Sequence, residues 1–580
     1  MDISFAILEI LLSVFLFFMS VRLKKYPTPK GRVLYFAPVA VALIMLAFVG
    51  FNLIMAGLYL ASSLLCLSLF TEKINVRRGI ALAAFLLSLS SLLMMKFSKN
   101  YKRYSISEDF ENVYHTMKEH YVLSEEKGID FDGLYLKYQP LFKEADKKQD
   151  LTLNYQLWQQ FSQEFYDGHV GYAPGNMKDK EVSRIICESY GNDYGLSIIK
   201  LSSGEFVAVN VEGSKASYSI KSLEEGNYLE DEETKLFNDA RLEFKTKNSD
   251  NDRLSLLNAG IKNGTVITKW NGKNIEDYYD DIKYYFFQAP VDENEEFYKP
   301  MYVAGMGGDS VEISFIDEEG KEKTVTVNKL GAYAPRLYNT LMTIDKGLKI
   351  NNLGWEALNE ETVVLRIYQM AYDMKTYAGT DYSEMTDKLR SELLAYKDAG
   401  YNNIIIDLRS NTGGSPFMVR GVACLFAPEG KHLAYYSAKI NENTATYERG
   451  EDKRFIIGEE AVSYEGEDLW HDGNITLLVN AQTVSAGDDM VYMMGEYPNV
   501  KIKGITKSNN SCQAVQAMDI STGSFSFSVV PNLTPEGDIA IDTLKDHKAR
   551  VDFDEYIPVT KEMVRAIFDY GEDYILQQVD

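Results

Sequence analysis

Three short segments of the chain hold the residue types that nucleophilic catalysis requires. The first is Asn480-Ala-Gln-Thr-Val-Ser485-Ala486-Gly487-Asp488, in which Ser485 follows a buried apolar run and opens a helix. A serine in such a turn exposes its hydroxyl, and the amide of the next residue, Ala486, points toward the same space. Serine is also a common helix N-cap, so the segment alone is a weak signal. It predicts Ser485 as a candidate nucleophile.

The second segment is Asp407-Leu-Arg-Ser-Asn-Thr-Gly413-Gly414, at the end of another buried run. Two glycines at a strand-to-helix turn present free backbone N–H groups, which suit the negative charge that develops on an attacked carbonyl oxygen. Glycine pairs close many turns, so this signal is also modest alone. We predict that the amide of Gly413 or Gly414 joins that of Ala486 in an oxyanion hole.

A serine nucleophile needs a base, and the chain has six histidines. His169 lies in Tyr166-Asp167-Gly168-His169-Val170, where a helical pattern ends and a strand begins. Imidazole titrates near pH 6.5, so it accepts a proton at neutral pH without a large pKa shift. A carboxylate should orient the ring. The sequence does not choose among the candidates for that role, which are Asp167, Asp488 and Glu536.

Together the three segments resemble the carboxyl-terminal processing and tricorn-like serine peptidases, the tail-specific protease family. Residues 407–414 match the family's Asp-Leu-Arg-x-Asn-x-Gly-Gly segment, and residues 167–169 match an Asp-Gly-His segment. Residues 485–488 match Ser-Ala-(Ser/Gly)-Glu, with Asp488 in place of Glu. The resemblance covers about 105–565 and implies a serine-type peptidase, a hydrolase, that cleaves extended peptide or protein substrates. We expect no cofactor and no metal ion.

One branch of the family uses a Ser–Lys dyad, with its lysine in Gly-x-x-Thr-x-Gly-Lys-Gly-x-x-Gln. Aligning residues 504–513 on Thr506 and Gln513 puts Asn509 where the lysine should stand. Lys507 is two residues away, and on a strand that spacing points the same way, so Lys507 is an alternative base. The missing lysine favours the branch in which histidine activates the serine, with His169 as base.

Two functions remain open. The first is an active membrane-anchored peptidase, and the second is a catalytically inactive peptide-binding protein on the same fold, since fold does not fix function. The missing lysine favours the second. The joint retention of Ser485, His169 and the double glycine favours the first.

The elements that position these residues read as an α+β protein. From 361 to 558 apolar strands alternate with amphipathic helices, which predicts an α/β layer. The resemblance implies a ClpP/crotonase-like catalytic core over 340–565. We expect strands at 363–367, 403–407 and 475–480, and helices at 383–399 and 416–426.

Two further regions precede this core. Apolar residues at helical spacing predict helices over 105–166, within a helical N-terminal segment at 105–189. Residues 190–328 are β-rich and resemble the family's peptide-binding PDZ-like domain, through Tyr194-Gly195-Leu196 and Ala259-Gly260-Ile261. An acidic stretch at about 212–252 reads as an insertion.

The first hundred residues consist mostly of apolar runs that are separated by short segments with basic residues. Runs at 3–21, 36–70 and 79–96 predict a four-helix transmembrane anchor over 1–97, with 36–70 folded back as two helices. Basic residues after the first and third helices place those loops inside, which puts the catalytic domain outside. Three spans would instead put it in the cytoplasm. We therefore expect a multi-pass protein of the cell membrane with the lipid bilayer as a partner.

The net charge of −24 excludes a nucleic-acid partner, because phosphate binding needs a basic face. The four cysteines show no CxxC or metal-like spacing, which excludes a disulfide framework. Neither the oligomeric state nor the cleavage preference follows from the sequence.

Overall fold

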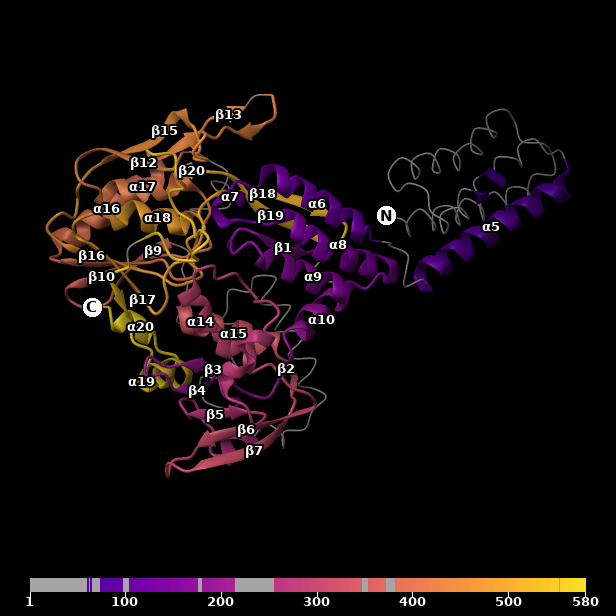
Figure 1. The fold of residues 1–580 in the computed structure, drawn as a ribbon, viewed down its shortest axis with the longest axis horizontal. Coiled ribbons are helices and arrows are strands. Elements are labelled where there is room, and N and C mark those ends of the chain that lie inside the picture. The colour runs from indigo at the N-terminus through magenta and orange to yellow at the C-terminus, as the bar shows by residue number, and fades with distance from the viewer. Residues whose placement is uncertain are drawn as a thin grey trace. The chain divides into compact units, whose positions relative to one another are not determined.

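The structure, a computed structural model, describes residues 60–61, 63–64, 73–97, 104–175, 180–213, 255–346, 353–371, 381–441, 443–551 and 553–579. The chain divides into two compact units, Met1–Tyr104 and Ser105–Asp580. Figure 1 labels most of the elements described below. The second unit holds all the candidate site residues.

The predicted four-helix membrane anchor is wrong, because no helix among the described residues is long and apolar enough to cross a membrane. The helix α5 (Ile74–Phe97) illustrates the reason. Its uncharged stretch runs from 79 to 95, between Arg78 and Lys96, and spans about 25 Å at 1.5 Å per residue. A hydrocarbon core is about 30 Å thick.

The other predicted spans, at 3–21 and most of 36–70, lie outside the described residues. The expected multi-pass location in the cell membrane, with its bilayer partner and extracytoplasmic catalytic domain, rested on the anchor and is contradicted by the same finding.

The helices predicted over 105–166 are confirmed. Asp130 and Asp150 act as N-caps of two of them, because each carboxylate accepts a backbone N–H of the first turn. The helices bury an aromatic cluster in which Phe110 stacks on Phe142 with ring centroids 4.5 Å apart. The four helices are α6 (Ile106–His120), α7 (Ser124–Lys127), α8 (Phe131–Lys148) and α9 (Leu151–Gln163).

A small antiparallel sheet links these helices to the C-terminal half of the chain. Its strand order is β1-β19-β18, with bounds β1 (Gly171–Pro174), β19 (Gly523–Val530) and β18 (Ala514–Ile520). Trp158 of α9 contacts Phe525 of β19, with ring centroids 4.9 Å apart. This contact brings the turn between α9 and β1, which carries His169, to residues some 350 positions later.

The central sheet has six strands in the order β21-β17-β16-β11-β10-β9. All neighbours are parallel except β9 and β10. The strands are β9 (Leu353–Ala357), β10 (Thr362–Ile367), β11 (Asn403–Asp407), β16 (Asn474–Leu478), β17 (Val500–Gly504) and β21 (Glu555–Tyr556). Figure 1 shows helices gathered along these strands, namely α16 (Ser383–Asp398), α17 (Pro416–Phe426) and α18 (Ala486–Gly495). The predicted strands and helices of this region are confirmed, and the strand expected at 475–480 ends at Leu478.

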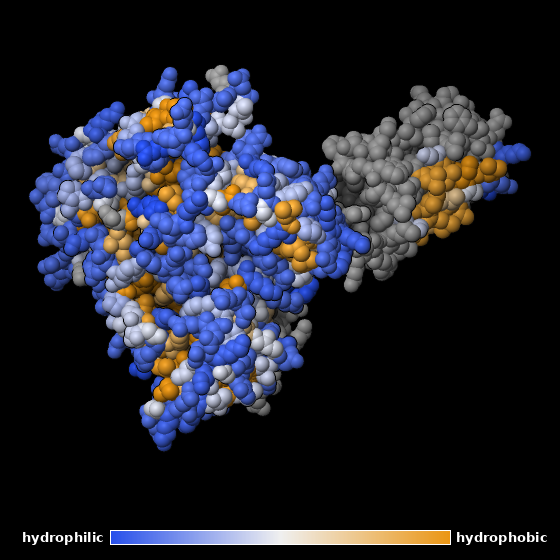
Figure 2. All heavy atoms as spheres, in the orientation of Figure 1, coloured by the Kyte–Doolittle hydropathy of each residue, from blue (hydrophilic) through white to orange (hydrophobic). Residues whose placement is uncertain are grey.

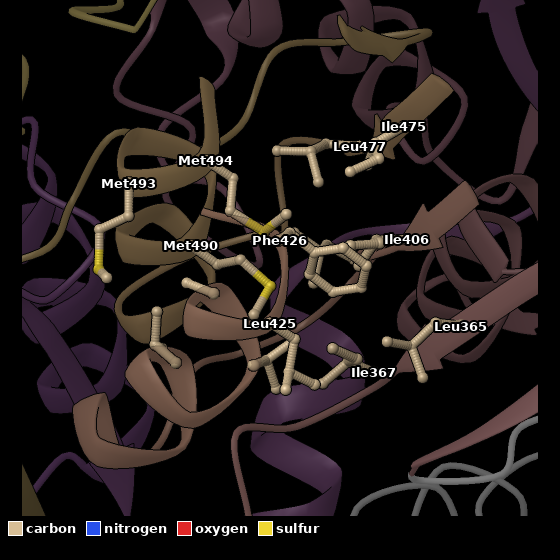
Figure 3. Packing of buried hydrophobic residues seen from close by; sticks show 14 of the residues in the cluster. Leu365, Ile367, Ile406, Leu425, Phe426, Ile475, Leu477, Met490, Met493 and Met494 are labelled. Carbon is tan, nitrogen blue, oxygen red and sulfur yellow. The ribbon is translucent and has the colours of Figure 1, made fainter. Parts of the chain in front are cut away.

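The core of this layer lies between the sheet and its helices. Figure 3 shows Met490 and Met494 of α18 beside Phe426 of α17, with Ile406 and Leu477 contributed by the sheet. Each is almost fully buried, and burying such a side chain stabilises the fold by about 1.5–3 kcal/mol. This packing fixes the starts of α17 and α18 against the ends of β11 and β16.

A third sheet is antiparallel, with the order β15-β12-β20, and β12 and β15 belong to a segment inserted between α17 and β16, whereas β20 follows β19 in the chain. Its strands are β12 (Gly430–Ala438), β15 (Ile457–Gly466) and β20 (Asn532–Leu533), and the hairpin β13 (Ile440–Asn441) and β14 (Thr446–Tyr447) lies within it. Two further short helical segments close the chain, α19 (Lys561–Arg565) with η4 (Ala566–Tyr570), and α20 (Tyr574–Gln577).

The middle region consists of small sheets and helices. The buried Arg336 ties it together by donating to the Asp193 and Glu212 carboxylates and to the Asn210 carbonyl. The PDZ-like assignment and the predicted domain boundaries stay predictions, and most of the insertion at 212–252 lies outside the described residues. The elements are α10 (Lys180–Ser189), β2 (Asn192–Asp193), β3 (Ser197–Lys200), β4 (Phe206–Val209), α13 (Ser255–Ala259), β5 (Ile267–Trp270), η3 (Ile275–Asp281), α14 (Asp292–Val303), β6 (Ser310–Ile316), β7 (Glu322–Asn328), β8 (Gly331–Ala332) and α15 (Ala334–Lys346).

The surface of the second unit follows the acidic composition. Figure 2 shows a face that is mostly hydrophilic, with small separate hydrophobic areas. The three cysteines in the described residues, Cys187, Cys424 and Cys512, are free thiols.

Candidate active site

Ser485 stands in a strained turn between β16 and α18. Its backbone has φ 62° and ψ −127°, a left-handed conformation that non-glycine residues rarely adopt, and such strain costs about 1–3 kcal/mol. The Ser485 amide donates to the Ser511 carbonyl over 2.8 Å, which holds the turn. Ser485 occupies the N-cap position of α18, yet its hydroxyl makes no capping hydrogen bond. The capping role that weakened the sequence signal is therefore not what this serine does.

The turns after β11 and β16 are tied to each other at the carboxyl edge of the sheet. Asn480 accepts from the Ser410 amide over 2.7 Å and donates to the Ser410 hydroxyl over 3.2 Å. The Val484 amide donates to the Asn411 carbonyl over 3.0 Å. The parallel pairing of β11 with β16 thus brings the double glycine to the serine.

Gly413 lies directly against the nucleophile candidate. Its φ is +90°, and a methyl group on its Cα would lie 2.4 Å from Ser485 Cβ and 3.0 Å from the Ala486 nitrogen. The Gly413 amide is already engaged, because it donates to Asn411 Oδ1 over 2.8 Å. Within the described residues, the amides of Gly414 and Ala486 make no hydrogen bond. Those two donors are the ones left for an oxyanion.

The histidine turn reaches the serine turn through Ser511. The Ser511 hydroxyl accepts from the Gly168 amide over 2.8 Å, while its carbonyl accepts from the Ser485 amide. Asp167 is fully buried, and its carboxylate accepts from the His169 amide over 2.8 Å. One residue therefore contacts both sequence-predicted segments, although the segments are more than 300 positions apart.

The His169 residue is half-buried. Burial lowers the pKa of His169 below its usual value, and the nearby Asp167 charge opposes that shift. Its Nδ1 is buried and has no hydrogen-bond partner among the described residues. A neutral imidazole is the form that accepts a proton.

The carboxylates predicted to orient the ring bind other groups or are exposed. Glu536 is on an exposed turn. Asp488 is fully buried and accepts from the amides of Asn510 and Ser511, each over 3.0 Å, and burial raises its pKa to about 7. The Asp167 carboxylate binds the backbone of His169 and the hydroxyls of Tyr121 and Ser528. In the described part of the chain, none of the three hydrogen-bonds the imidazole.

Lys507 is engaged in an ion pair. Its Nζ lies 2.6 Å from a Glu293 carboxylate oxygen, and this contact lowers the pKa of Glu293. Its amide and carbonyl bind the Asn294 side chain. Residues 505–510 form no strand, so the argument that Lys507 and Asn509 point the same way does not apply. This geometry argues against Lys507 as the base.

The structure adds residues that the sequence did not single out. Asp542 is fully buried, pairs with Ser511 in an antiparallel bridge, and forms a 2.7 Å ion pair with the buried Lys127. Lys127 also donates to the Tyr166 carbonyl over 2.8 Å, next to the histidine turn. Lys127 and Asp542 are 415 positions apart in the chain. The local sequence around each resembles that of a polar surface segment, so no local pattern indicated this pair.

The arginine of the Asp-Leu-Arg segment links two distant parts of the chain. Arg409 is buried, and its guanidinium donates to Asp407 and to Asp573 over 2.7–2.9 Å. These bonds attach the segment before α20 to the end of β11 and stabilise the glycine turn.

Comparison with known proteins identifies two family models that match parts of the chain. Residues 361–542 match Peptidase family S41, and residues 103–153 match the Tricorn protease C1 domain. Residues 361–542 therefore resemble the S41 peptidase family. Members of this family are serine peptidases, so the match identifies the chain as a serine-type hydrolase whose substrate is a peptide or protein. None of the curated proteins matches the chain.

Among the solved structures that match the chain, one reaches a TM-score of 0.50 and shares its fold. A mutant of CPAF is 13% identical, covers 82% of this chain and 96% of its own, and has a TM-score of 0.50. Mature CPAF complexed with lactacystin is 12% identical, with coverages of 82% and 97% and a TM-score of 0.49. The photosystem II D1 C-terminal processing protease is 14% identical, with coverages of 81% and 98% and a TM-score of 0.31.

Proposed function

We propose that this protein cleaves extended peptide or protein substrates with Ser485 as nucleophile and His169 as general base. The observation that carries the proposal is the position of Ser511, which binds the backbone of Ser485 on one side and that of Gly168 on the other. This arrangement supports a serine and a histidine that face one shared site.

The chemistry follows from the groups at the two turns. Ser485 Oγ attacks the scissile carbonyl carbon while its proton passes to His169. The carbonyl oxygen becomes an oxyanion, which the amides of Ala486 and Gly414 stabilise. We favour Gly414 over Gly413 because the Gly413 amide already binds Asn411. His169 then gives the proton to the leaving amine, and water hydrolyses the acyl-enzyme by the reverse sequence of proton transfers.

Region 190–328 is proposed to act as a PDZ-like module beside this site. The support is its set of short antiparallel strands together with the segments quoted above. Such modules bind an extended peptide by adding it as a strand to a sheet edge.

Steady-state cleavage of a denatured protein substrate tests the assignment of the base. We expect His169→Ala to lower kcat by about 100-fold or more, because proton transfer contributes about 10²–10⁴-fold. Lys507→Ala, which removes the Glu293 ion pair only, should keep kcat within about twofold of wild type, as expected for a partly exposed pair. A loss in Lys507→Ala with full activity in His169→Ala would reverse the assignment.

A catalytically inactive peptide-binding protein is the second candidate. The observation that favours it is Asn509 at the position of the family's lysine. If the protein is inactive, the wild-type chain should bind a denatured substrate as tightly as the Ser485→Ala variant does, and should cleave none of it. Turnover by the wild type that Ser485→Ala lacks would exclude this candidate.

A further inference from the structure

We propose that Asn509 positions His169 for catalysis: its side-chain oxygen accepts the hydrogen bond of the Nδ1–H of His169, directly or through one bound water. The inference rests on the proposed function, in which His169 is the base. It assigns the orienting role to a neutral amide in place of the carboxylates that the sequence suggested.

Asn509 is anchored to the turn that carries the nucleophile. Its amide donates to the Thr483 carbonyl over 2.9 Å, and its side-chain Nδ2 donates to the carbonyls of Ala481 and Gln288 over 2.9 and 2.8 Å. Because both hydrogens of Nδ2 point to carbonyl oxygens, the alternative orientation of the amide would set oxygen against oxygen. The orientation is thereby fixed, and Oδ1 faces away from the serine turn.

The side-chain oxygen of Asn509 faces the histidine turn. A methyl group on Gly168, the residue before His169, would lie 2.1 Å from Asn509 Oδ1. Asn509 thus stands between the two turns, bonded to one and in contact with the other. Its side chain is 3% exposed.

Two buried polar atoms at this place lack partners among the described residues: Asn509 Oδ1 and His169 Nδ1. One is an acceptor, and the other is a donor in one tautomer of imidazole. Leaving a buried polar group without a hydrogen bond costs free energy. A hydrogen bond between them, made directly after a small ring rotation or through one water, satisfies both atoms at once.

The proposed hydrogen bond also selects the imidazole tautomer that catalysis needs. A neutral imidazole takes the serine proton on Nε2 only when its own proton is on Nδ1. An acceptor opposite Nδ1 selects that tautomer. A neutral amide does so without adding a negative charge, which agrees with a His169 pKa that burial lowers.

Asp542 is the rival for this role, because its Oδ2 is also buried without a partner in the described residues. Its other oxygen is bound by Lys127, which compensates the charge. The contact with Gly168 belongs to Asn509, so we assign the role to Asn509.

Nitrogen NMR of the full chain labelled with ¹⁵N-histidine tests the proposal without relying on turnover. The His169 signals are assigned by their absence in His169→Ala. At a pH above the His169 pKa, we expect the wild type to carry its proton on Nδ1. Observation of the Nε2–H tautomer in the wild type would overturn the proposal, whatever the folding of any variant.

Asn509→Ala extends the test. We expect mixed tautomers and a fall in kcat of about 10–100-fold, the usual effect of losing a group that orients a functional imidazole, with KM little changed. Asn510→Ala is the matched control: it removes an equally buried neighbouring amide, should destabilise the loop, and should keep the wild-type tautomer. A tautomer shift in Asp542→Asn and none in Asn509→Ala would assign the role to Asp542.

These outcomes separate the inference from the proposed function. Full activity in His169→Ala would refute His169 as the base, and with it the catalytic meaning of Asn509. Loss of activity in His169→Ala, with an unchanged tautomer in Asn509→Ala, would refute the positioning role alone.

Discussion

Gly413 lies so close to Ser485 that a single added methyl group would meet the serine Cβ at 2.4 Å and its Oγ at 2.9 Å. The double glycine is therefore required by space as well as by its left-handed backbone, since the neighbouring Gly414 would meet the Met370 carbonyl at 2.4 Å. The glycine turn and the serine turn form one closely packed surface at the sheet edge.

Gly413→Ala should lower kcat by about 100-fold or more, which is the effect of disturbing an oxyanion site, because the added methyl group displaces Ser485 and the Ala486 amide. Gly430→Ala is the control: Gly430 also has a positive φ, +117°, but nothing lies within 4 Å of its added methyl group. It should lose stability and keep kcat. Equal kcat values in the two variants would contradict the close approach.

Lys127 and Asp542 form a buried pair, so removing one partner leaves an uncompensated charge. Lys127→Met should lower the free energy of unfolding by about 3–5 kcal/mol. The double variant Lys127→Met/Asp542→Leu should recover most of that loss. Urea denaturation of the single and double variants measures both values.

The exposed pair between Lys453 and Glu125 serves as the comparison, with both side chains more than half exposed. Lys453→Met should cost no more than about 1 kcal/mol. Similar losses in Lys127→Met and Lys453→Met would show that the buried pair has no special role.

The activity should respond to pH through His169. Burial lowers its pKa, so the base stays unprotonated to lower pH than a free histidine, and kcat/KM should fall only as the pH drops below the usual value near 6.5. The Asp167 charge raises that pKa, so Asp167→Asn should move the acid limb to still lower pH. Asp472→Asn, which removes a carboxylate beside the exposed His471, should leave the limb in place. An acid limb above the ordinary histidine pKa would contradict the assignment.

Stability should respond to pH through Asp488. Burial raises its pKa from 3.8 to about 7, so the folded chain binds more protons than the unfolded chain between these values. This group's contribution is therefore full below pH 3.8 and is lost as the pH rises through about 7. The wild type should lose stability relative to Asp488→Asn as the pH rises through this window. If the free energies of unfolding of the wild type and of Asp488→Asn differ by the same amount at all pH values, the raised pKa of Asp488 is contradicted.

The sequence predicted the local elements of the catalytic layer well, because its apolar runs are bounded by turn residues. The strand at Asn403–Asp407 and the helix at Pro416–Phe426 have the predicted bounds. The order of strands then brings Gly413 and Ser485 together. The strained φ of Ser485 was not visible in its residue type, since the same serine reads as an ordinary helix cap.

The parts that the sequence did not predict depend on contacts between distant segments. Ser511 contacts Gly168 across 343 positions, and no spacing rule reports such a pair. The sequence could not choose among the orienting carboxylates for this reason, because each could be judged only by its neighbours in the chain. The membrane anchor was inferred from apolar runs, but the uncharged stretch of α5 between Arg78 and Lys96 is too short to span a bilayer.

The central claim is that Ser485 is the nucleophile, and mass spectrometry of the chain after reaction with a fluorophosphonate probe tests it most directly. We predict one phosphonyl adduct per chain on the peptide that contains Ser485, and none in Ser485→Ala. We also predict slower labelling in His169→Ala, because the serine then lacks its base. An adduct that persists in Ser485→Ala, or a folded wild type that forms no adduct, would contradict the claim.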